Sequence, residues 1–357
     1  MKKYEQFDKR ELKVCPLAER KNQLDAAALC AGTGDVALSA EARAVVEETA
    51  QRIRRARELG RPVIMAFGAH AIKNGLGSVL IALMERGWVT HLATNGAGII
   101  HDWEFAFQGK SGEDVRRNVA TGTFGLWEET GRFINLALCA GAYSGRGYGE
   151  AVGAMIEEDG LLFPAWEEMA HRGDGAAADL CEIMKRWKLS PGWMAVPHPS
   201  KRYSVQAAAY RLGIPFTGHP MFGHDIIYEH PMCCGAAIGR TAERDFLRFA
   251  ASVRNLEDGV YLSVGSAVMS PMIFEKSFSM AQNVHLQAGT KITRHYIAVV
   301  DLAGASWDWS LGEPPPDNPA YYLRYCKTFS RMGGTLRTCS ADNRAFLPAL
   351  LRVLLIS

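Results

Sequence analysis

Short apolar runs alternate with amphipathic windows along most of the chain, and this alternation constrains the fold more than any other feature. The first two runs are Pro62–Phe67 and Val89–Thr94, and a helical window over Ile72–Glu85 separates them. The remaining runs are Gly192–Val196, Ile214–Thr217, Gly259–Val264 and Tyr296–Leu302, and further helical windows lie near residues 40–59, 113–131, 146–159, 175–188, 200–212 and 241–253. Strand, helix and strand in succession need crossover connections, so the sequence predicts an α/β fold with a mostly parallel sheet and helices on both faces.

The chain has 357 residues, which is enough for one large domain or two ordinary ones. It carries no internal repeat, and the proline run at residues 314–316 is too short to link two domains and predicts a rigid loop. We therefore expect a single α/β domain over residues 41–357. Residues 1–40 have weaker periodicity, so we expect them to form an N-terminal arm or cap.

Charge and cysteine usage exclude several classes of protein. The chain has 40 Lys and Arg against 38 Asp and Glu and no basic block, so neither nucleic acid nor a membrane surface is expected as a partner. No apolar run approaches the ~20 residues that span a bilayer, and residues 1–13 lack the apolar stretch of a secretory signal. The eight cysteines show no CxxC spacing, which is typical of reduced thiols, and we expect a cytoplasmic protein.

Glycine-rich turns follow the first two predicted strands. Gly68 closes the first strand, and residues 94–98, Thr-Asn-Gly-Ala-Gly, close the second. Bare backbone at such a turn lets a phosphate approach closely, although ordinary turn chemistry also explains it, and the spacing is not that of a GxGxxG motif. His101 and Asp102 directly follow the second turn and are our preferred functional pair, with Glu104 nearby. Residues 100–130 fit either a lid with an acid–base cluster or a solvated helix with charge pairs.

The segment Ile214–Pro231 is the richest in polar groups. Together with His198 upstream, it contains His219, His224, Asp225, Glu229 and His230. Histidine and carboxylate side chains are zinc or iron ligands, but the spacing matches no tight ligand motif such as HExxH. We therefore predict no metal ion, and ordinary hydrogen bonding in a loop explains any single histidine equally well.

Lys327 lies between aromatic residues on an apolar, helix-like stretch. A lysine in this setting usually keeps its ammonium in water while its stem covers apolar neighbours. If the ammonium is desolvated instead, its pKa falls and it becomes a nucleophile for imine chemistry.

Taken together, these segments resemble deoxyhypusine synthase and its bacterial homologues from about residue 60 almost to the C-terminus. Tyr325–Lys327 falls on the family's Trp-Gly-Lys, which carries the catalytic lysine. The other matched segments are residues 68–76, Val89–Gly98 with His101 and Asp102, Ser200–Pro215, His224–His230, Gly259–Val268, and Ala341 with Asp342.

The resemblance implies a doubly wound, Rossmann-type NAD-binding fold and a homotetramer with active sites at a dimer interface. It also implies an NAD-dependent transferase. In that reaction NAD takes a hydride from the carbon that bears an amine, and the lysine attacks the resulting imine. An aminobutyl-type group then passes from the enzyme to an amine acceptor.

Site residues follow from the same matches. Lys327 would be the nucleophile, Asp225 would hold the cationic amine, and His101 and Asp102 would complete the catalytic set. The expected substrate-binding residues are Tyr325, His224 and Glu229. The expected NAD-binding residues are Gly68, Asn74, Thr94, Asn95, Gly96, Gly265, Ser266, Asp308 and Asp342.

Several positions depart from the family pattern. The glycine triplet is Val264-Gly265-Ser266, the following histidine pair is Ser270-Pro271, and the acidic residues before the lysine are Ala320 and Tyr321. Unpaired ammonium groups are costly in a closed site, so the loss of carboxylates favours a donor that is shorter or less cationic than spermidine, and a small-molecule acceptor. Two alternatives stay open: an NAD-dependent dehydrogenase, lyase or cyclodeaminase-like enzyme without covalent lysine chemistry, and a non-catalytic NAD-binding regulatory protein.

Overall fold

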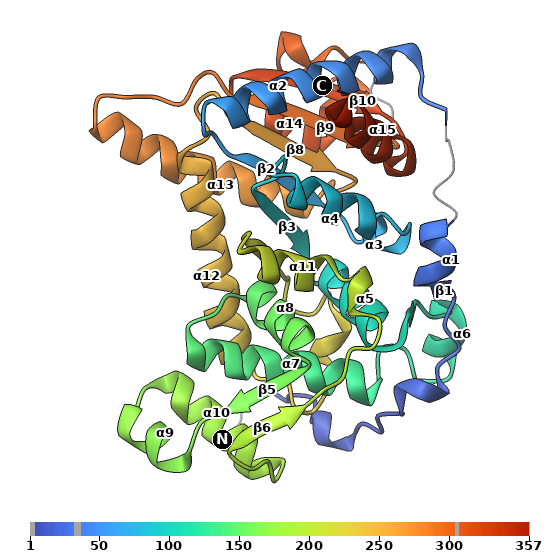
Figure 1. Cartoon of the computed structure of the whole chain (residues 1–357), viewed down its shortest axis with the longest axis vertical. Coiled ribbons are helices and arrows are strands. Elements are labelled where there is room, and N and C mark those ends of the chain that lie inside the picture. The colour runs from blue at the N-terminus through green and yellow to red at the C-terminus, as the bar shows by residue number, and fades with distance from the viewer. Residues whose placement is uncertain (1–3, 32–36, 304–306, 357) are drawn as a thin grey trace.

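A six-stranded parallel sheet forms the centre of one half of the molecule in the computed structural model, which describes residues 4–31, 37–303 and 307–356 (Figure 1). Its strands are β2 (Val63–Phe67), β3 (His91–Asn95), β7 (Phe216–His219), β8 (Val260–Val264), β9 (Tyr296–Asp301) and β10 (Thr335–Ser340). Every neighbouring pair is parallel, in the order β10-β9-β8-β2-β3-β7. Counted along the chain from β2, this is the order 3-2-1-4-5-6, the doubly wound order of dinucleotide-binding folds. The predicted fold class is confirmed.

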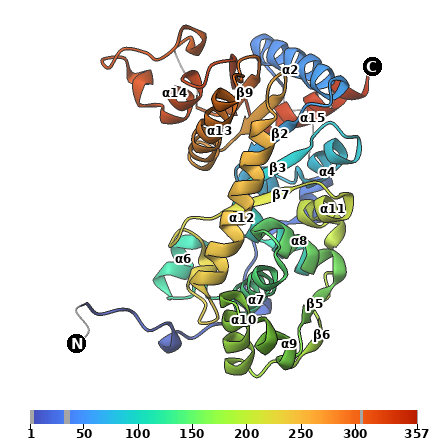
Figure 2. The ribbon, with the colours of Figure 1, turned by 90° about the vertical axis from the view of Figure 1, so that its left-hand side faces the viewer.

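Side chains of the sheet alternate between two apolar clusters, because successive residues of a strand point to opposite faces. In β2, Val63, Met65 and Phe67 belong to one cluster, and Ile64 and Ala66 belong to the other. Figure 2 shows α13 and α14 on one side of the sheet and α2, α4 and α15 on the other. The bounds of these helices are α2 (Ala40–Glu58), α4 (Gly77–Glu85), α13 (Met269–Gln287), α14 (Arg324–Ser330) and α15 (Asn343–Leu355).

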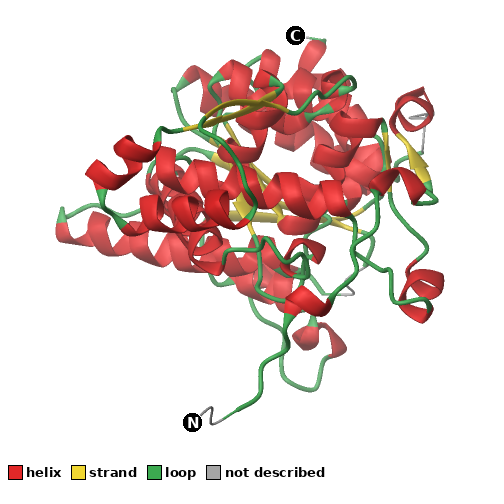
Figure 3. Cartoon of the chain, turned by 90° about the horizontal axis from the view of Figure 1, so that it is seen from below, coloured by secondary structure: helices red, strands yellow, loops and turns green. Residues whose placement is uncertain are grey.

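The second half of the molecule is mostly helical (Figure 3). Its chain segment follows β3 and precedes β7 in the sequence. It contains α5 (Gly96–Gln108), α6 (Val115–Ala120), α7 (Glu128–Ser144), α8 (Tyr148–Glu158), α9 (Trp166–Arg172), α10 (Gly175–Arg186) and α11 (Val205–Leu212). An antiparallel hairpin, β5 (Gly160–Phe163) with β6 (Gly192–Ala195), lies within it. The 20-residue helix α12 (Gly235–Arg254) runs from this half to the sheet (Figure 2).

The N-terminal segment packs along the helical half (Figure 1). Its elements are two short 3-10 turns (Lys9–Glu11 and Leu17–Glu19), β1 (Leu24–Asp25) and α1 (Ala26–Ala31), and β1 pairs antiparallel with β4 (Lys110–Ser111). The backbone N–H of Cys15 donates to the carbonyl of Leu126 at 2.8 Å, and Leu17 is buried. The expectation of an arm or cap over residues 1–40 stays a prediction, and residues 1–3 and 32–36 lie outside the described part.

Several elements differ from the sequence predictions, among them α5, α7 and α13, which lie wholly or mostly outside the predicted helical windows. The window Ile72–Glu85 is split into α3 (His70–Lys73) and α4, because Gly75 adopts a φ of +76° that ends the first helix. The strand at residues 192–195 belongs to the separate hairpin and not to the parallel sheet. The edge strand β10 was not predicted, since only Leu336 and Cys339 of it are buried and it forms no apolar run.

A pair of buried histidines lies between β3, β7 and α12. The Nδ1 atom of His91 lies 2.8 Å from Oγ of Ser252, and its Nε2 lies 3.0 Å from Oγ1 of Thr217. The Nε2 atom of His219 lies 2.9 Å from the same Thr217 oxygen. Burial lowers the pKa of both histidines to about 3, so both are neutral in the folded protein.

These histidines predict a loss of stability in mild acid. Below the ordinary histidine pKa of about 6.5 the unfolded chain binds protons that the folded chain excludes, so each residue's contribution is complete above that pH and declines below it, by at most ~1.4 kcal/mol per pH unit. We expect chemical denaturation between pH 7.5 and 5 to show that the free energy of unfolding declines less steeply with falling pH in His219→Gln than in the unaltered chain. The difference in slope should correspond to about one proton. Identical slopes for the two proteins would contradict the assignment.

Candidate functional site

Two bare backbone turns meet where the strand order reverses. A Cβ atom added to Gly68, directly after β2, would lie only 2.1 Å from the carbonyl oxygen of Gly265, directly after β8. The N–H of Gly68 donates to the carbonyl of Val264 at 3.1 Å. The carboxyl ends of the strands on either side of such a switch point are where ligands bind in open α/β sheets. The candidate site is therefore at this edge of the sheet.

Three cavities surround this edge, and we name each after one lining residue. The His101 cavity, of about 310 Å³, lies at the start of α5 and is lined mainly by Arg20, Lys73, Ala97, His101, Glu104, His224 and Asp225. The Asn343 cavity, of about 420 Å³, is lined mainly by His70, Asn74, Gly265, Asp301, Asp342, Asn343 and Arg344. The Tyr325 cavity, of about 700 Å³, is lined mainly by Ser39, Glu41, Asp301, Asp308, Tyr325, Cys326 and Ser340.

The first two cavities share the short helix α3, which directly follows β2. Lys73 of this helix lines the His101 cavity, whereas His70 and the capping residue Asn74 line the Asn343 cavity. Asp301, at the end of β9, lines both the Asn343 and the Tyr325 cavities. The structure therefore places the His101 cavity beside two further cavities, which share Asp301 and lie at the ends of β8, β9 and β10.

A chain of hydrogen bonds runs from the Nδ1 atom of His101 through Ser111 to Glu104. This Nδ1 atom lies 2.7 Å from Oγ of Ser111, which in turn donates to Oε2 of Glu104 at 2.5 Å. The Glu104 carboxylate also binds both terminal nitrogens of Arg20, each at 2.7 Å, and accepts from Thr130 at 2.8 Å. Burial acts to raise the pKa of Glu104, but Arg20 outweighs it and holds that pKa below its ordinary value. Glu104 is thus an ionised, fully bonded group.

Asp225 lines the same cavity and is under-satisfied. Its carboxylate lies at the N-terminus of α5, where a Cβ on Gly96 would come within 2.1 Å of Oδ2. Oδ2 is buried and has no hydrogen-bond partner among the described residues. Burial raises the pKa of Asp225 to about 6, which leaves it mostly ionised at neutral pH. A buried carboxylate in this state gains from a cationic partner.

Three of the predicted site residues form hydrogen bonds with other parts of the chain, which hold the fold together. Asp102 is buried and accepts hydrogen bonds from Ser204, Val205 and Gln206 at the start of α11, so it points away from the His101 cavity. Thr94 is buried and donates to the carbonyl of Phe67 at 2.9 Å. Asn95 caps α5 by accepting from the N–H of Gly98 at 2.9 Å.

Three other predicted NAD-binding residues lie together in one cavity. Asn74, Gly265 and Asp342 all line the Asn343 cavity, and Nδ2 of Asn74 donates to Oδ1 of Asn343 at 2.8 Å. Ser266 is buried and accepts from the N–H of Ser270 at 3.2 Å.

The predicted substrate residues are divided between cavities. His224 lines the His101 cavity, and Tyr325 lines the Tyr325 cavity together with Asp308. Within the described residues, the lining of the three cavities does not include Glu229, which is half-buried.

Lys327 does not line the His101 cavity, to which Asp225 belongs. Its Nζ forms an ion pair with Glu313 at 2.7 Å and lies 3.1 Å from the ring centre of Tyr321, with a side chain 13% exposed. Desolvation lowers its pKa, but the bond to Glu313 outweighs this and holds the pKa above its ordinary value. Within residues 4–31, 37–303 and 307–356, the linings of the three cavities do not include Lys327.

Sequence reasoning missed Arg20, Lys73, Ser111, Asp301 and Asn343. An arginine 84 positions from its carboxylate partner gives no local signal, and Ser111 lies in a strand of only two residues. Asn343 directly follows the predicted Asp342, so its helix-start position was the one available clue.

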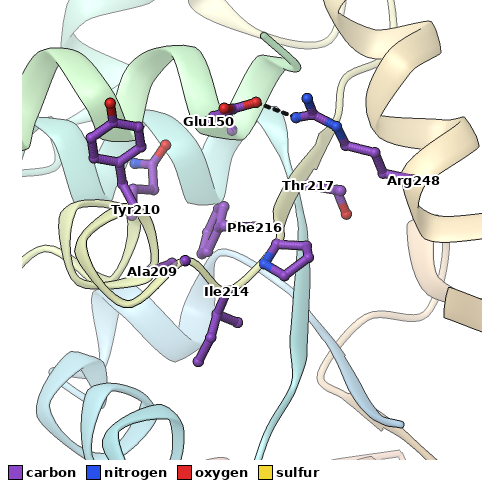
Figure 4. A pocket seen from close by; sticks show the side chains of 11 residues that line it. Glu150, Ala209, Tyr210, Ile214, Phe216, Thr217 and Arg248 are labelled. Carbon is purple, nitrogen blue, oxygen red and sulfur yellow. Dashed lines mark hydrogen bonds and ion pairs between the residues drawn. The ribbon is translucent and has the colours of Figure 1, made fainter.

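A further hollow lies at the opposite end of β7 (Figure 4). It has a volume of about 240 Å³ and is lined by Ile214 and Phe216 with Tyr210, and the ion pair between Glu150 and Arg248 is at its edge. Because it adjoins the amino end of a parallel strand, it lies away from the ligand-binding edge of the sheet.

The described part of the chain contains no group of three His, Cys, Asp or Glu residues placed to hold a metal ion. Among the same residues, none of the helices is both long and apolar enough to cross a membrane.

Neither a family model nor a curated protein matches the chain. Among solved structures, it is similar to the apo form of ArgZ, an arginine dihydrolase from the ornithine-ammonia cycle in Cyanobacteria, with a TM-score of 0.43 and 15% identity over 87% of this chain. The complex of AgrE with ornithine and NAD+ gives 0.44 and 16% over 89%. This chain spans about a third of the length of each, 32% and 34% respectively.

A protein from Entamoeba histolytica, provisionally assigned as a deoxyhypusine synthase, gives a TM-score of 0.41 and 11% identity, covering 87% of this chain and 88% of that one. At these values, the similarities carry no argument about the site or the reaction.

Proposed function

We propose that the chain is an NAD-linked enzyme that acts on a small cationic amine. The observation that carries this proposal is the under-satisfied carboxylate of Asp225 in the His101 cavity, beside a hollow at the switch point of a doubly wound sheet. The amine would occupy the His101 cavity, and the dinucleotide would lie along the ends of β8, β9 and β10.

The residues at the switch point fit a dinucleotide. The backbone is bare at Gly68, where an added Cβ would lie 2.1 Å from the carbonyl oxygen of Gly265, and at Gly265 itself, whose φ of +57° favours glycine. Asn74 and Asn343 offer amide groups, and Asp301 and Asp342 offer carboxylates of the kind that bind ribose hydroxyls. When bound, NAD would supply a hydride acceptor for the carbon that bears the amine, after the ammonium has given one proton to the Asp225 carboxylate, and the products would be an iminium ion and NADH.

The protein's own part of the chemistry is to bind and orient the amine. Asp225 would pair with its ammonium, because the attraction of the two charges offsets the free-energy cost of burying this carboxylate, the cost that raises its pKa. The charged residues that line this cavity are Arg20, Lys73, Glu104, Glu113 and Asp225, two cations and three carboxylates, so the lining has a net charge of −1 and one positive charge on the ligand balances it. A singly charged amine therefore fits this cavity better than a polyamine does.

Transfer of an alkylamine group through Lys327 is the second form of the proposal. Its support is the largely buried, aromatic surroundings of the lysine. Glu313 keeps this lysine charged, and an ammonium has no lone pair with which to attack an imine. This form therefore requires another copy of the chain to bring its Lys327 to the His101 cavity, with release from Glu313, in keeping with the expected homotetramer.

Binding of NADH and formation of NADH from NAD+ test the proposal. We expect calorimetry to detect NADH binding, and a panel of butylamine, putrescine, spermidine and ornithine to give NADH with at least one singly charged amine or amino acid. Absence of both binding and turnover across the panel would reject it. Binding without turnover would favour the regulatory alternative.

Borohydride reduction during turnover separates the two forms of the proposal. A reduced adduct mapped by mass spectrometry to Lys327 would establish covalent transfer, with the exposed Lys276 as the reference lysine for non-specific labelling. Continued NADH formation by Lys327→Ala without any adduct would establish the non-covalent form.

A further inference from the structure

We infer that Nε2 of His101 is held as a permanent hydrogen-bond acceptor facing the substrate, with Ser111 and Glu104 as positioning residues, so that the site selects a protonated primary amine. The identity of the ligand rests on the proposed function, whereas the state of the imidazole rests on the contacts alone.

The positions of the hydrogen atoms follow from Glu104. Its Oε1 accepts from Arg20 and Thr130, and its Oε2 accepts from Arg20 and Ser111. An ionised carboxylate carries no proton, so the single hydroxyl hydrogen of Ser111 is used in this bond. Ser111 can then only accept from the imidazole, which places the hydrogen of His101 on Nδ1. The lone pair of a neutral imidazole with this tautomer is on Nε2.

His101 stays neutral over the working pH range. Burial lowers its pKa to about 4, and the opposing effect of the Glu104 charge is too weak to reverse this. Lys73 and Arg20, which line the same cavity, act in the same direction as burial. Nε2 is bonded to no described residue, and His101 lines the cavity, so this atom is available to a ligand.

Two acceptors with no partner among the described residues therefore line one cavity: Oδ2 of Asp225 and Nε2 of His101. Oδ2 of Asp225 is buried and unpaired, which costs free energy, and Nε2 of His101 can accept a further N–H or O–H donor from a ligand. A primary ammonium carries three N–H donors and can supply both, whereas a quaternary ammonium carries none. The binding step needs no proton transfer, because the ammonium donates and the imidazole accepts.

Nitrogen NMR of the full chain labelled with 15N-histidine tests the state of His101 without any ligand. The signal that disappears in His101→Gln identifies the residue, and we expect its shifts to show the Nδ1–H tautomer at pH 7. Ser111→Ala should move the population towards Nε2–H. Thr130→Val removes a hydroxyl from the same carboxylate without touching His101, so it should leave the tautomer unchanged. An Nε2–H tautomer in the unaltered chain, or no response to Ser111→Ala, would overturn the inference.

Ligand selection is tested with butylamine and its N,N,N-trimethyl derivative as probes on the same labelled protein. We expect butylamine to shift the Nε2 signal of His101 and the trimethyl derivative to leave it in place. Equal responses to the two probes would overturn the selection. If the tautomer is as inferred but NADH is neither bound nor formed, the proposed function fails while the assignment of His101 stands.

Discussion

Replacing Arg20 by methionine should lower the free energy of unfolding by about 3–5 kcal/mol, because it leaves a buried charge without its partner. Arg20 and Glu104 form a bidentate pair at 2.7 Å, and their side chains are 2% and 1% exposed. The pair also fastens the N-terminal segment to α5. Its loss should therefore release residues 4–31 as well as destabilise the fold, which chemical denaturation and limited proteolysis would measure.

Two variants make this expectation specific. The double variant Arg20→Met/Glu104→Met removes both charges and should recover much of the lost stability, since apolar replacements of a buried pair are often neutral. Arg55→Met breaks an exposed pair with Glu58 and should change stability by less than ~0.5 kcal/mol. If Arg20→Met and Arg55→Met lowered the free energy of unfolding equally, the buried pair would be no more important for stability than an exposed one.

Asp225→Asn should lower kcat/KM for the amine by roughly 10²- to 10³-fold, the range expected when one partner of a desolvated charge pair is removed. The amide keeps the shape of the carboxylate but cannot balance an ammonium. The same change should stabilise the protein above neutral pH by about 1–3 kcal/mol, because it removes a carboxylate that burial disfavours in its charged form.

The sign of the stability effect follows from the direction of the pKa shift. A carboxyl whose pKa is raised to about 6 in the folded protein binds its proton more tightly than the unfolded chain does. The folded state therefore gains stability as pH falls towards 4, and the advantage of Asp225→Asn should disappear there. Asp317 is exposed, so Asp317→Asn is the matched control and should change neither kcat/KM nor the free energy of unfolding. If Asp225→Asn were stable and fully active, Asp225 would not belong to the proposed site.

Much of the fold could be predicted from the sequence because the parallel strands are buried on both faces. β2 and β8 are buried along their whole length and, apart from Ser263, consist of apolar or aromatic residues, so both strands could be predicted without knowing their neighbours. The edge strand β10 is half-exposed and carries Arg337 and two threonines, which hide it from the same reasoning. Similarly, the hairpin strand at residues 192–195 has the composition of a sheet strand but a different partner.

The candidate site was predicted less completely because its contacts join distant parts of the chain. His101, His224 and Asp225 were named from their position after predicted strands, and the structure brings them to one cavity. Asp102 adjoins His101 in sequence, but adjacent residues of a helix point in different directions, and this one caps α11. The placement of Lys327 depends on Glu313, in a loop whose path no local pattern indicates.

The one-turn helix α3 has a thermodynamic consequence. Since it borders both the His101 and the Asn343 cavities, a ligand that shifts this helix in one cavity alters the wall of the other. Linkage makes any such effect reciprocal: the factor by which a dinucleotide changes the affinity for an amine is the factor by which the amine changes the affinity for the dinucleotide. Measuring one of these affinities with and without the second ligand therefore gives the coupling in both directions.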